Sequence, residues 1–119
     1  MPINLPPAIV CERTWVSDGD TLWCRNLPVR VRLIGIDAPE LPGHCNPGRL
    51  CTPGNGSASK RVLIGLVQSG PVAVKPQGYD HYGRILARVS VNQVDLSCEM
   101  VARGAAVRRY APIDCPKGR

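Results

Sequence analysis

The chain reads Val31-Arg32-Leu33-Ile34-Gly35-Ile36-Asp37-Ala38-Pro39-Glu40, an apolar strand that carries one arginine and then breaks into two carboxylates separated by a proline. Burying Arg32 among aliphatic residues costs free energy unless an anion or a carboxylate meets its guanidinium. Asp37 and Glu40 follow where the strand is expected to end. The segment therefore predicts a functional site in which a phosphate and a cation balance these three charges.

A second acidic cluster precedes the strand, in the turn Ser17-Asp18-Gly19-Asp20. Adjacent strands would bring this turn close to Asp37. Two carboxylates, a backbone carbonyl and water make an oxygen-rich site suited to Ca²⁺ or Mg²⁺. The alternative for Asp18-Gly19 is that it only serves the tight turn.

A second arginine follows a turn in Asp80-His81-Tyr82-Gly83-Arg84. An arginine fork binds two phosphate oxygens at once and stabilises the charge of a five-coordinate phosphorus transition state. A surface arginine beside a turn is the alternative for this short motif.

The bulk composition describes a small basic chain of 119 residues with a net charge of +6 and no Phe. Its length predicts one domain, residues 1–119, with a core from about 8 to 110 and tails at 1–7 and 111–119. The charge excess lies in the second half, where residues 60–119 hold ten Lys and Arg against four acids. A basic half of this kind favours a polyanionic partner, and nucleic acid is the commonest one. The alternative is that these basic side chains are simply solvated.

Periodicity and turn residues predict the order of elements. We expect strands over residues 8–16, 21–25 and 29–36, a loop over 41–56, a helix capped by Asn55 or Ser57, strands over 72–75 and 85–91, and a short helix from Asp95 to Gly104. This order is that of a mainly β OB-fold, a five-stranded Greek-key barrel with two helices. Other small α+β folds have the same number of strands and helices.

Six cysteines are many for so short a chain, and their even number favours disulfides in a secreted or periplasmic protein, with a cytoplasmic location as the alternative. In an exported protein, a signal peptide would already have been removed. The sequence shows neither the basic stretch followed by an apolar run that is typical of a signal peptide nor a run long enough to predict a membrane span. Cys45 and Cys51 could close a small ring, or bind zinc together with His44. The remaining four, Cys11, Cys24, Cys98 and Cys115, allow three pairings. The alternative for Cys11 and Cys24 is that they are buried strand thiols.

Four motifs together resemble one known family in order and spacing. They are Asp18-Gly19-Asp20-Thr21-Leu22, the segment 31–40, the segment 80–84, and Met100-Val101-Ala102-Arg103-Gly104. The chain resembles the staphylococcal (micrococcal) nuclease, or thermonuclease-like, family from about Ile9 to Tyr110. The resemblance implies an OB-fold nuclease that needs one Ca²⁺ ion and cleaves DNA and RNA with little sequence specificity, leaving 3′-phosphate ends.

The resemblance also implies a role for each matching residue. Asp20 and Asp37 match the metal carboxylates, and the carbonyl of Ala38 matches the backbone ligand. Glu40 matches the proposed general base, and the phosphate-binding arginines are Arg32 and Arg84. The residues expected to position substrate are Tyr82, His81 and Tyr110.

The chain departs from the well-known member of the family in several respects, among them His81, which stands where that member has a lysine. It lacks a further C-terminal helix, and it carries six cysteines that could replace the stability of that helix. The alternative function is a non-catalytic nucleic-acid-binding or protein-binding module on the same barrel, and in either case we expect a monomer.

Overall fold

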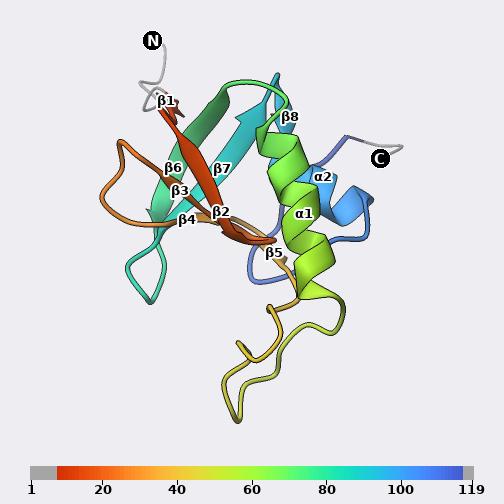
Figure 1. The fold of residues 1–119 in the computed structure, drawn as a ribbon. Coiled ribbons are helices and arrows are strands. Elements are labelled where there is room, and N and C mark those ends of the chain that lie inside the picture. Colours follow the sequence, from red (N-terminus) through yellow and green to blue (C-terminus); the bar gives the residue numbers. More distant parts are fainter. Residues whose placement is uncertain (1–7, 117–119) are drawn as a thin grey trace.

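The computed structural model describes residues 8–116, which form a curled β-sheet with two helices packed on one side (Figure 1). The helices are α1, Gly56–Val67, and α2, Leu96–Ala102. The strands of the main sheet are β1 Ile9–Val10, β2 Thr14–Asp18, β3 Thr21–Cys24, β4 Val31–Leu33, β6 Val72–Tyr79, β7 Ile85–Val91 and β8 Val94–Asp95, and a separate pair is formed by β5 Ile36–Asp37 and β9 Val107–Arg108.

The strand order shows why the sheet curls. It runs β1-β6-β7-β4-β3-β2, with β8 paired to β7. β1 and β2 follow each other in the chain, yet they lie at opposite ends of this order, so the first strand of the barrel is split between two edges. All neighbours in the sheet are antiparallel except β4 and β7, which are parallel. With β1 and β2 counted as one broken strand and the two-residue β8 set aside, five strands build this mainly β, OB-like fold, as the sequence predicted.

The predicted strand over residues 29–36 is wrong, because it is two strands. β4 ends at Leu33, and Gly35 has a φ of +79°. β5 then turns away from β4 to pair with β9. Glycine is needed at this corner both for its left-handed backbone and for space, since a Cβ at Gly35 would lie 2.3 Å from the side chain of Ile113. The corner separates Arg32 from Asp37 along the chain and lets them meet in space.

Two other strand boundaries also differ from expectation. The strand predicted over residues 8–16 breaks at Cys11, where the chain passes from one edge of the sheet to the other. The strand predicted over 72–75 continues to Tyr79, because Pro76 and Gly78 produce a bulge in its pairing with β7 rather than an end. Part of the predicted C-terminal tail is also ordered, since Ile113 packs against the core and its carbonyl accepts from Arg108 Nη1 at 2.9 Å.

Each helix begins at a side-chain cap that the sequence signalled. The Asn55 side chain accepts from the backbone N–H of Ala58, and Asp95 accepts from that of Cys98. α1 then buries Ser59 and Leu63 against the barrel, and Ser59 Oγ donates to the Ala105 carbonyl at 2.7 Å. Since Phe is absent from the chain, the core is aliphatic, and its fully buried large side chains include Leu22, Val31, Leu33, Ile36, Leu63, Val74, Val89, Leu96 and Met100.

All six cysteines form disulfides, which are Cys11–Cys24, Cys45–Cys51 and Cys98–Cys115. The zinc alternative for Cys45, Cys51 and His44 is therefore wrong, as is the alternative that Cys11 and Cys24 are free thiols. Three disulfides are compatible with an oxidising compartment. Within residues 8–116, no helix has the length and apolar character needed to cross a bilayer.

Candidate active site

Arg32 lies at the centre of the site and has the anionic partners that its burial requires. It is only 6% exposed, and its Nη2 atom lies 3.4 Å from Asp20 Oδ2 and 3.2 Å from Asp37 Oδ1. Its Nη1 donates to the Leu33 carbonyl at 3.0 Å. The two carboxylates predicted to bind metal therefore converge on one nitrogen of one guanidinium.

Asp20 joins the acidic turn to the end of β5. Its Oδ2 accepts from the backbone N–H of Ala38 at 2.9 Å, and its Oδ1 accepts from Thr21 Oγ1 at 2.8 Å. Burial raises the pKa of Asp20 from 3.8 to about 6; the nearby Arg32 guanidinium opposes this shift, and Asp18 adds to it. Asp18 accepts from the backbone N–H of Asp20, so it serves the turn, as the alternative interpretation held.

Asp37 is held by two residues that the sequence did not single out. Its Oδ2 accepts from Thr52 Oγ1 at 2.5 Å and from Arg109 Nη1 at 3.0 Å, and Arg109 also donates to Thr52 at 3.3 Å. Thr52 lies in the loop after Glu40, where no motif marks it. Arg109 is one of the ten basic residues of the second half, and its place beside Tyr110 is the one signal that the sequence offers for it.

Glu40 lies at the edge of the site and is half-buried. Its Oε1 forms an ion pair with Arg49 Nη1 at 3.1 Å. Arg49 belongs to the loop between β5 and α1, which carries the Cys45–Cys51 disulfide. This loop therefore places one more cation, unpredicted from the sequence, beside the proposed general base.

Arg84 is held by the turn that precedes β7. Asp80 Oδ1 accepts from the backbone N–H groups of Tyr82 and Arg84, both at 2.9 Å, and Asp80 Oδ2 accepts from Arg84 Nε at 2.6 Å. Burial alone would raise the pKa of Asp80, but the hydrogen bonds and charge from Arg84 lower it overall. The guanidinium also lies 5.4 Å from the centre of the Tyr82 ring. Arg84 is thus a positioned side chain rather than a loose surface arginine.

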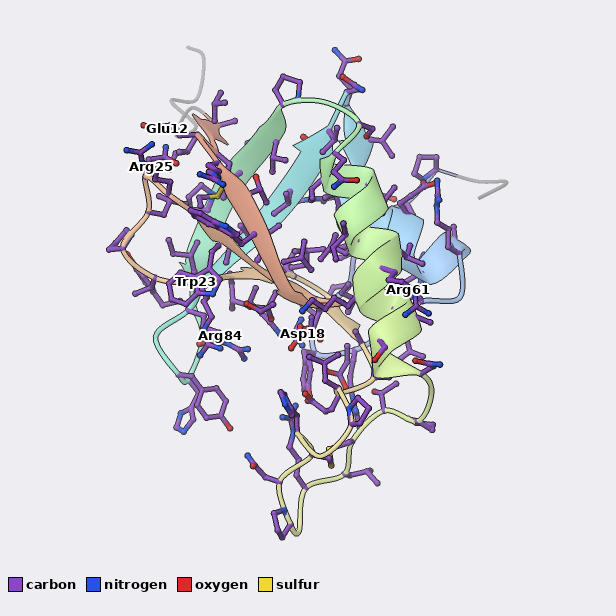
Figure 2. All side chains as sticks on the ribbon, in the orientation of Figure 1. Glu12, Asp18, Trp23, Arg25, Arg61 and Arg84 are labelled. Atoms are coloured by element: carbon purple, nitrogen blue, oxygen red, sulfur yellow. A yellow bond between two sulfur atoms is a disulfide. The ribbon has the colours of Figure 1, made fainter. Side chains whose placement is uncertain are left out.

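A pocket of about 470 Å³ gathers the basic and aromatic candidates. Tyr110, with a φ of +72°, places its ring 5.9 Å from the Arg32 guanidinium. The lining includes Arg32, Arg49, His81, Tyr82, Arg84, Leu86 and Tyr110. Asp20, Asp37, Ala38 and Glu40 are not among the lining residues; Arg32 and Arg49 connect the carboxylates to the pocket. In Figure 2, Arg84 and Asp18 lie at the same end of the barrel.

The carboxylate pair fits a hard divalent cation. Asp20 and Asp37 are both buried and meet at one guanidinium nitrogen, and the raised pKa of Asp20 shows that this guanidinium does not fully offset the cost of a buried carboxylate. Oxygen ligands of this kind suit Ca²⁺ or Mg²⁺. No group of three His, Cys, Asp or Glu side chains that could hold a metal occurs in the described part of the chain. A bound cation would therefore need backbone, water or substrate oxygens to complete its ligands.

The structure is thus an OB-like barrel with two arginines in one pocket, and Arg32 of that pair also contacts two buried carboxylates. The sequence comparisons then give the family. A sequence model of the staphylococcal nuclease homologue family matches residues 30–118, and the chain belongs to this family.

Several relatives carry endonuclease names. The chain is 36% identical over 99 residues to an uncharacterized endonuclease of Haemophilus influenzae, covering 81% of this chain and 50% of that protein. It is 38% identical over 89 residues to the probable endonuclease LCL3 of Saccharomyces cerevisiae, covering 70% of this chain and 31% of that protein. Protein ParB of Escherichia coli is 37% identical over 79 residues, covering 65% and 39%. The chain thus spans half or less of the length of these relatives.

Proposed function

We propose that this chain is a calcium-dependent endonuclease that hydrolyses phosphodiester bonds of DNA and RNA with little sequence specificity and leaves 3′-phosphate ends. One observation carries the proposal: Arg32 lines the pocket that it shares with Arg84, while its Nη2 atom contacts both buried carboxylates. The same arginine therefore connects the basic pocket to the carboxylate pair.

In this proposal, Arg32 and Arg84 bind the scissile phosphate and stabilise the extra negative charge that develops at phosphorus. Charge-assisted hydrogen bonds from guanidinium groups suit both tasks. Asp80 holds Arg84 through Nε, and the buried carboxylates hold Arg32. Both guanidinium groups are thus fixed before substrate arrives, which limits the entropy lost on binding.

Asp20, Asp37 and the carbonyl of Ala38 would hold the Ca²⁺ ion. When bound, such an ion would act as a Lewis acid toward the phosphate. Thr52 and Arg109 hold the Asp37 carboxylate in place, and Ala38 donates its N–H to Asp20.

Glu40 accepts a proton from the attacking water or orients that water. Its ion pair with Arg49 positions its carboxylate at the edge of the pocket. Tyr82, Tyr110 and His81 contact the sugar or base on either side of the reacting phosphate. Phosphate contacts and stacking carry little base information, which accounts for broad specificity.

The three disulfides support a secreted or periplasmic location for this activity. The basic charge supports nucleic acid as the substrate, with an attraction that weakens as salt increases.

The test is cleavage of single-stranded DNA, double-stranded DNA and RNA in Ca²⁺, followed by addition of EGTA and analysis of the product ends. Glu40→Gln and Arg84→Ala should each reduce cleavage at least a hundredfold, by the size of a general-base or oxyanion contribution. Arg61→Ala, which removes an exposed arginine from α1, is the charge-matched control (Figure 2). Wild-type rates in both site variants, or DNA binding without EGTA-sensitive cleavage, would contradict the proposal and favour a binding module.

A further inference from the structure

The two tryptophans of the chain lie side by side on the outer face of the barrel. Trp15 of β2 and Trp23 of β3 are direct partners in the antiparallel pairing of these strands. They are 46% and 42% exposed, while the neighbours of Trp23 in β3, Leu22 and Cys24, face the core. A cross-strand aromatic pair stabilises a sheet. Nearly half of each indole nevertheless stays exposed to solvent.

An arginine guanidinium also lies over each indole ring. The guanidinium of Arg13 lies 5.2 Å from the ring centre of Trp15, and that of Arg30 lies 5.9 Å from the ring centre of Trp23. These contacts combine stacking surface with positive charge at one place.

The pairing register connects this pair of rings to the candidate active site. Leu22 pairs with Val31, so Trp23 lies next to Arg30. Val31 in turn pairs with Ile85, and the N–H of Ile85 donates to the Arg30 carbonyl, so residue 84 lies next to residue 30. One row therefore crosses four strands or their ends in the order Trp15, Trp23, Arg30, Arg84.

The row ends at the pocket on the same face of the sheet. Arg84 lines the pocket. Arg32 of β4 and Leu86 of β7, which pair with each other two residues further along these strands, also line it. Three strand spacings of about 4.8 Å separate Trp15 from Arg84, which is roughly 14 Å. That length matches about four nucleotides of a stacked single strand at ~3.4 Å each.

We propose that the row formed by Trp15, Trp23 and Arg30, together with Arg13, is a second nucleic-acid surface that binds single-stranded DNA or RNA next to the pocket. The bases stack on the two indoles, and the two guanidinium groups contact the backbone phosphates. Exposed rings together with guanidinium groups favour a nucleic acid, which offers flat bases and anionic phosphates, over an apolar protein partner. The position of these nucleotides relative to the cleaved bond rests on the function proposed above, whereas the binding itself does not.

The tryptophans themselves report the binding. Since the chain has two Trp and both lie in this row, all of its tryptophan fluorescence comes from this surface. Titration with an oligodeoxythymidylate of about twenty nucleotides, in EGTA to prevent cleavage, should quench this fluorescence to saturation. Arg30→Ala should weaken the binding several-fold, while Arg61→Ala on α1 should leave it nearly unchanged. Absence of quenching, or equal effects of both variants, would overturn the proposal.

Kinetics provide the second measurement. Trp15→Ala and Trp23→Ala should each raise the KM for a long single-stranded substrate by about 5-fold to 150-fold, the equivalent of one lost stacking contact. Both should leave the cleavage of a dinucleotide unchanged, and Trp→Phe variants should recover most of the affinity. Circular dichroism of each variant checks that it is folded. Arg30→Ala is a further test of the surface, because it leaves both tryptophan rings in place. A KM for the long substrate that does not change would overturn the surface.

The two proposals fail in different ways. Saturable quenching without any Ca²⁺-dependent cleavage would support the second surface and contradict the nuclease function. Cleavage that the Trp and Arg30 variants do not affect would support the nuclease function and overturn the second surface.

Discussion

Removing the charge of Asp20 should change stability in a way that depends on pH. Burial raises the pKa of this carboxyl from 3.8 to about 6 in the folded protein. Between these two values the folded state holds a proton that the unfolded state has lost, so the free energy of unfolding falls as pH rises through this window. The full difference is about 2 pKa units at 1.36 kcal/mol each, or about 3 kcal/mol of lost stability above pH 6. In metal-free buffer, therefore, the ionised Asp20 destabilises the fold.

The assay compares the wild type with Asp20→Asn in EGTA by thermal denaturation at pH 4 and at pH 8. Asn removes the titration, so its stability relative to the wild type should improve by roughly 2 to 3 kcal/mol between the two pH values, or about 10 °C in Tm. Comparing the two pH values cancels any fixed cost of the amide in its hydrogen bonds to Ala38 and Thr21. Saturating Ca²⁺ should stabilise the wild type and not the variant. An identical Tm difference at pH 4 and pH 8 would refute the reasoning.

Thr52→Val removes a hydroxyl that donates to Asp37, and it should reduce Ca²⁺ affinity by about 10-fold to 100-fold in calorimetry, with Thr52→Ser close to wild type; an unchanged affinity for the Val variant would contradict the role. Replacing Cys98 and Cys115 together by Ala opens a disulfide between residues 17 apart, which should lower stability by about 3 kcal/mol in thermal melts, and an unaltered Tm would count against it. Leu63→Ala empties a fully buried position of α1, and urea denaturation should show a loss of about 2 to 5 kcal/mol rather than a surface-like effect below 0.5 kcal/mol.

The sequence predicted the parts of the fold that depend on local signals. The caps at Asn55 and Asp95 fix the helix starts, and alternation fixes β7. The corner at Gly35 could not be predicted, because residues 31–36 are apolar apart from Arg32 and resemble one strand. The close approach of Ile113, from far along the chain, shows that the chain must bend there. Strand breaks of this kind depend on tertiary contacts that a short window of sequence does not contain.

The candidate site divides in the same way. Arg32 could be predicted because a charge in an apolar strand needs a partner, and the structure supplies Asp20 and Asp37. Thr52 and Arg109 could not be predicted, because they contact Asp37 from 15 and 72 residues away along the chain and neither belongs to a motif. Side chains that position others carry no chemical signature of their own.

The placement of the three disulfides divides the molecule into two kinds of region. No disulfide cysteine lies between Cys51 and Cys98, so α1 and the hairpin of β6 and β7 are held by non-covalent contacts, which include the ion pairs of Arg84 with Asp80 and of Arg88 with Asp95. Reduction should therefore loosen the two ends of the chain and the loop before α1, while amide protons in the paired strands β6 and β7 remain slow to exchange with deuterium. Hydrogen exchange on the oxidised and the reduced protein would then distinguish the segments that need their disulfides from the strands β6 and β7, which keep their structure when the disulfides are reduced.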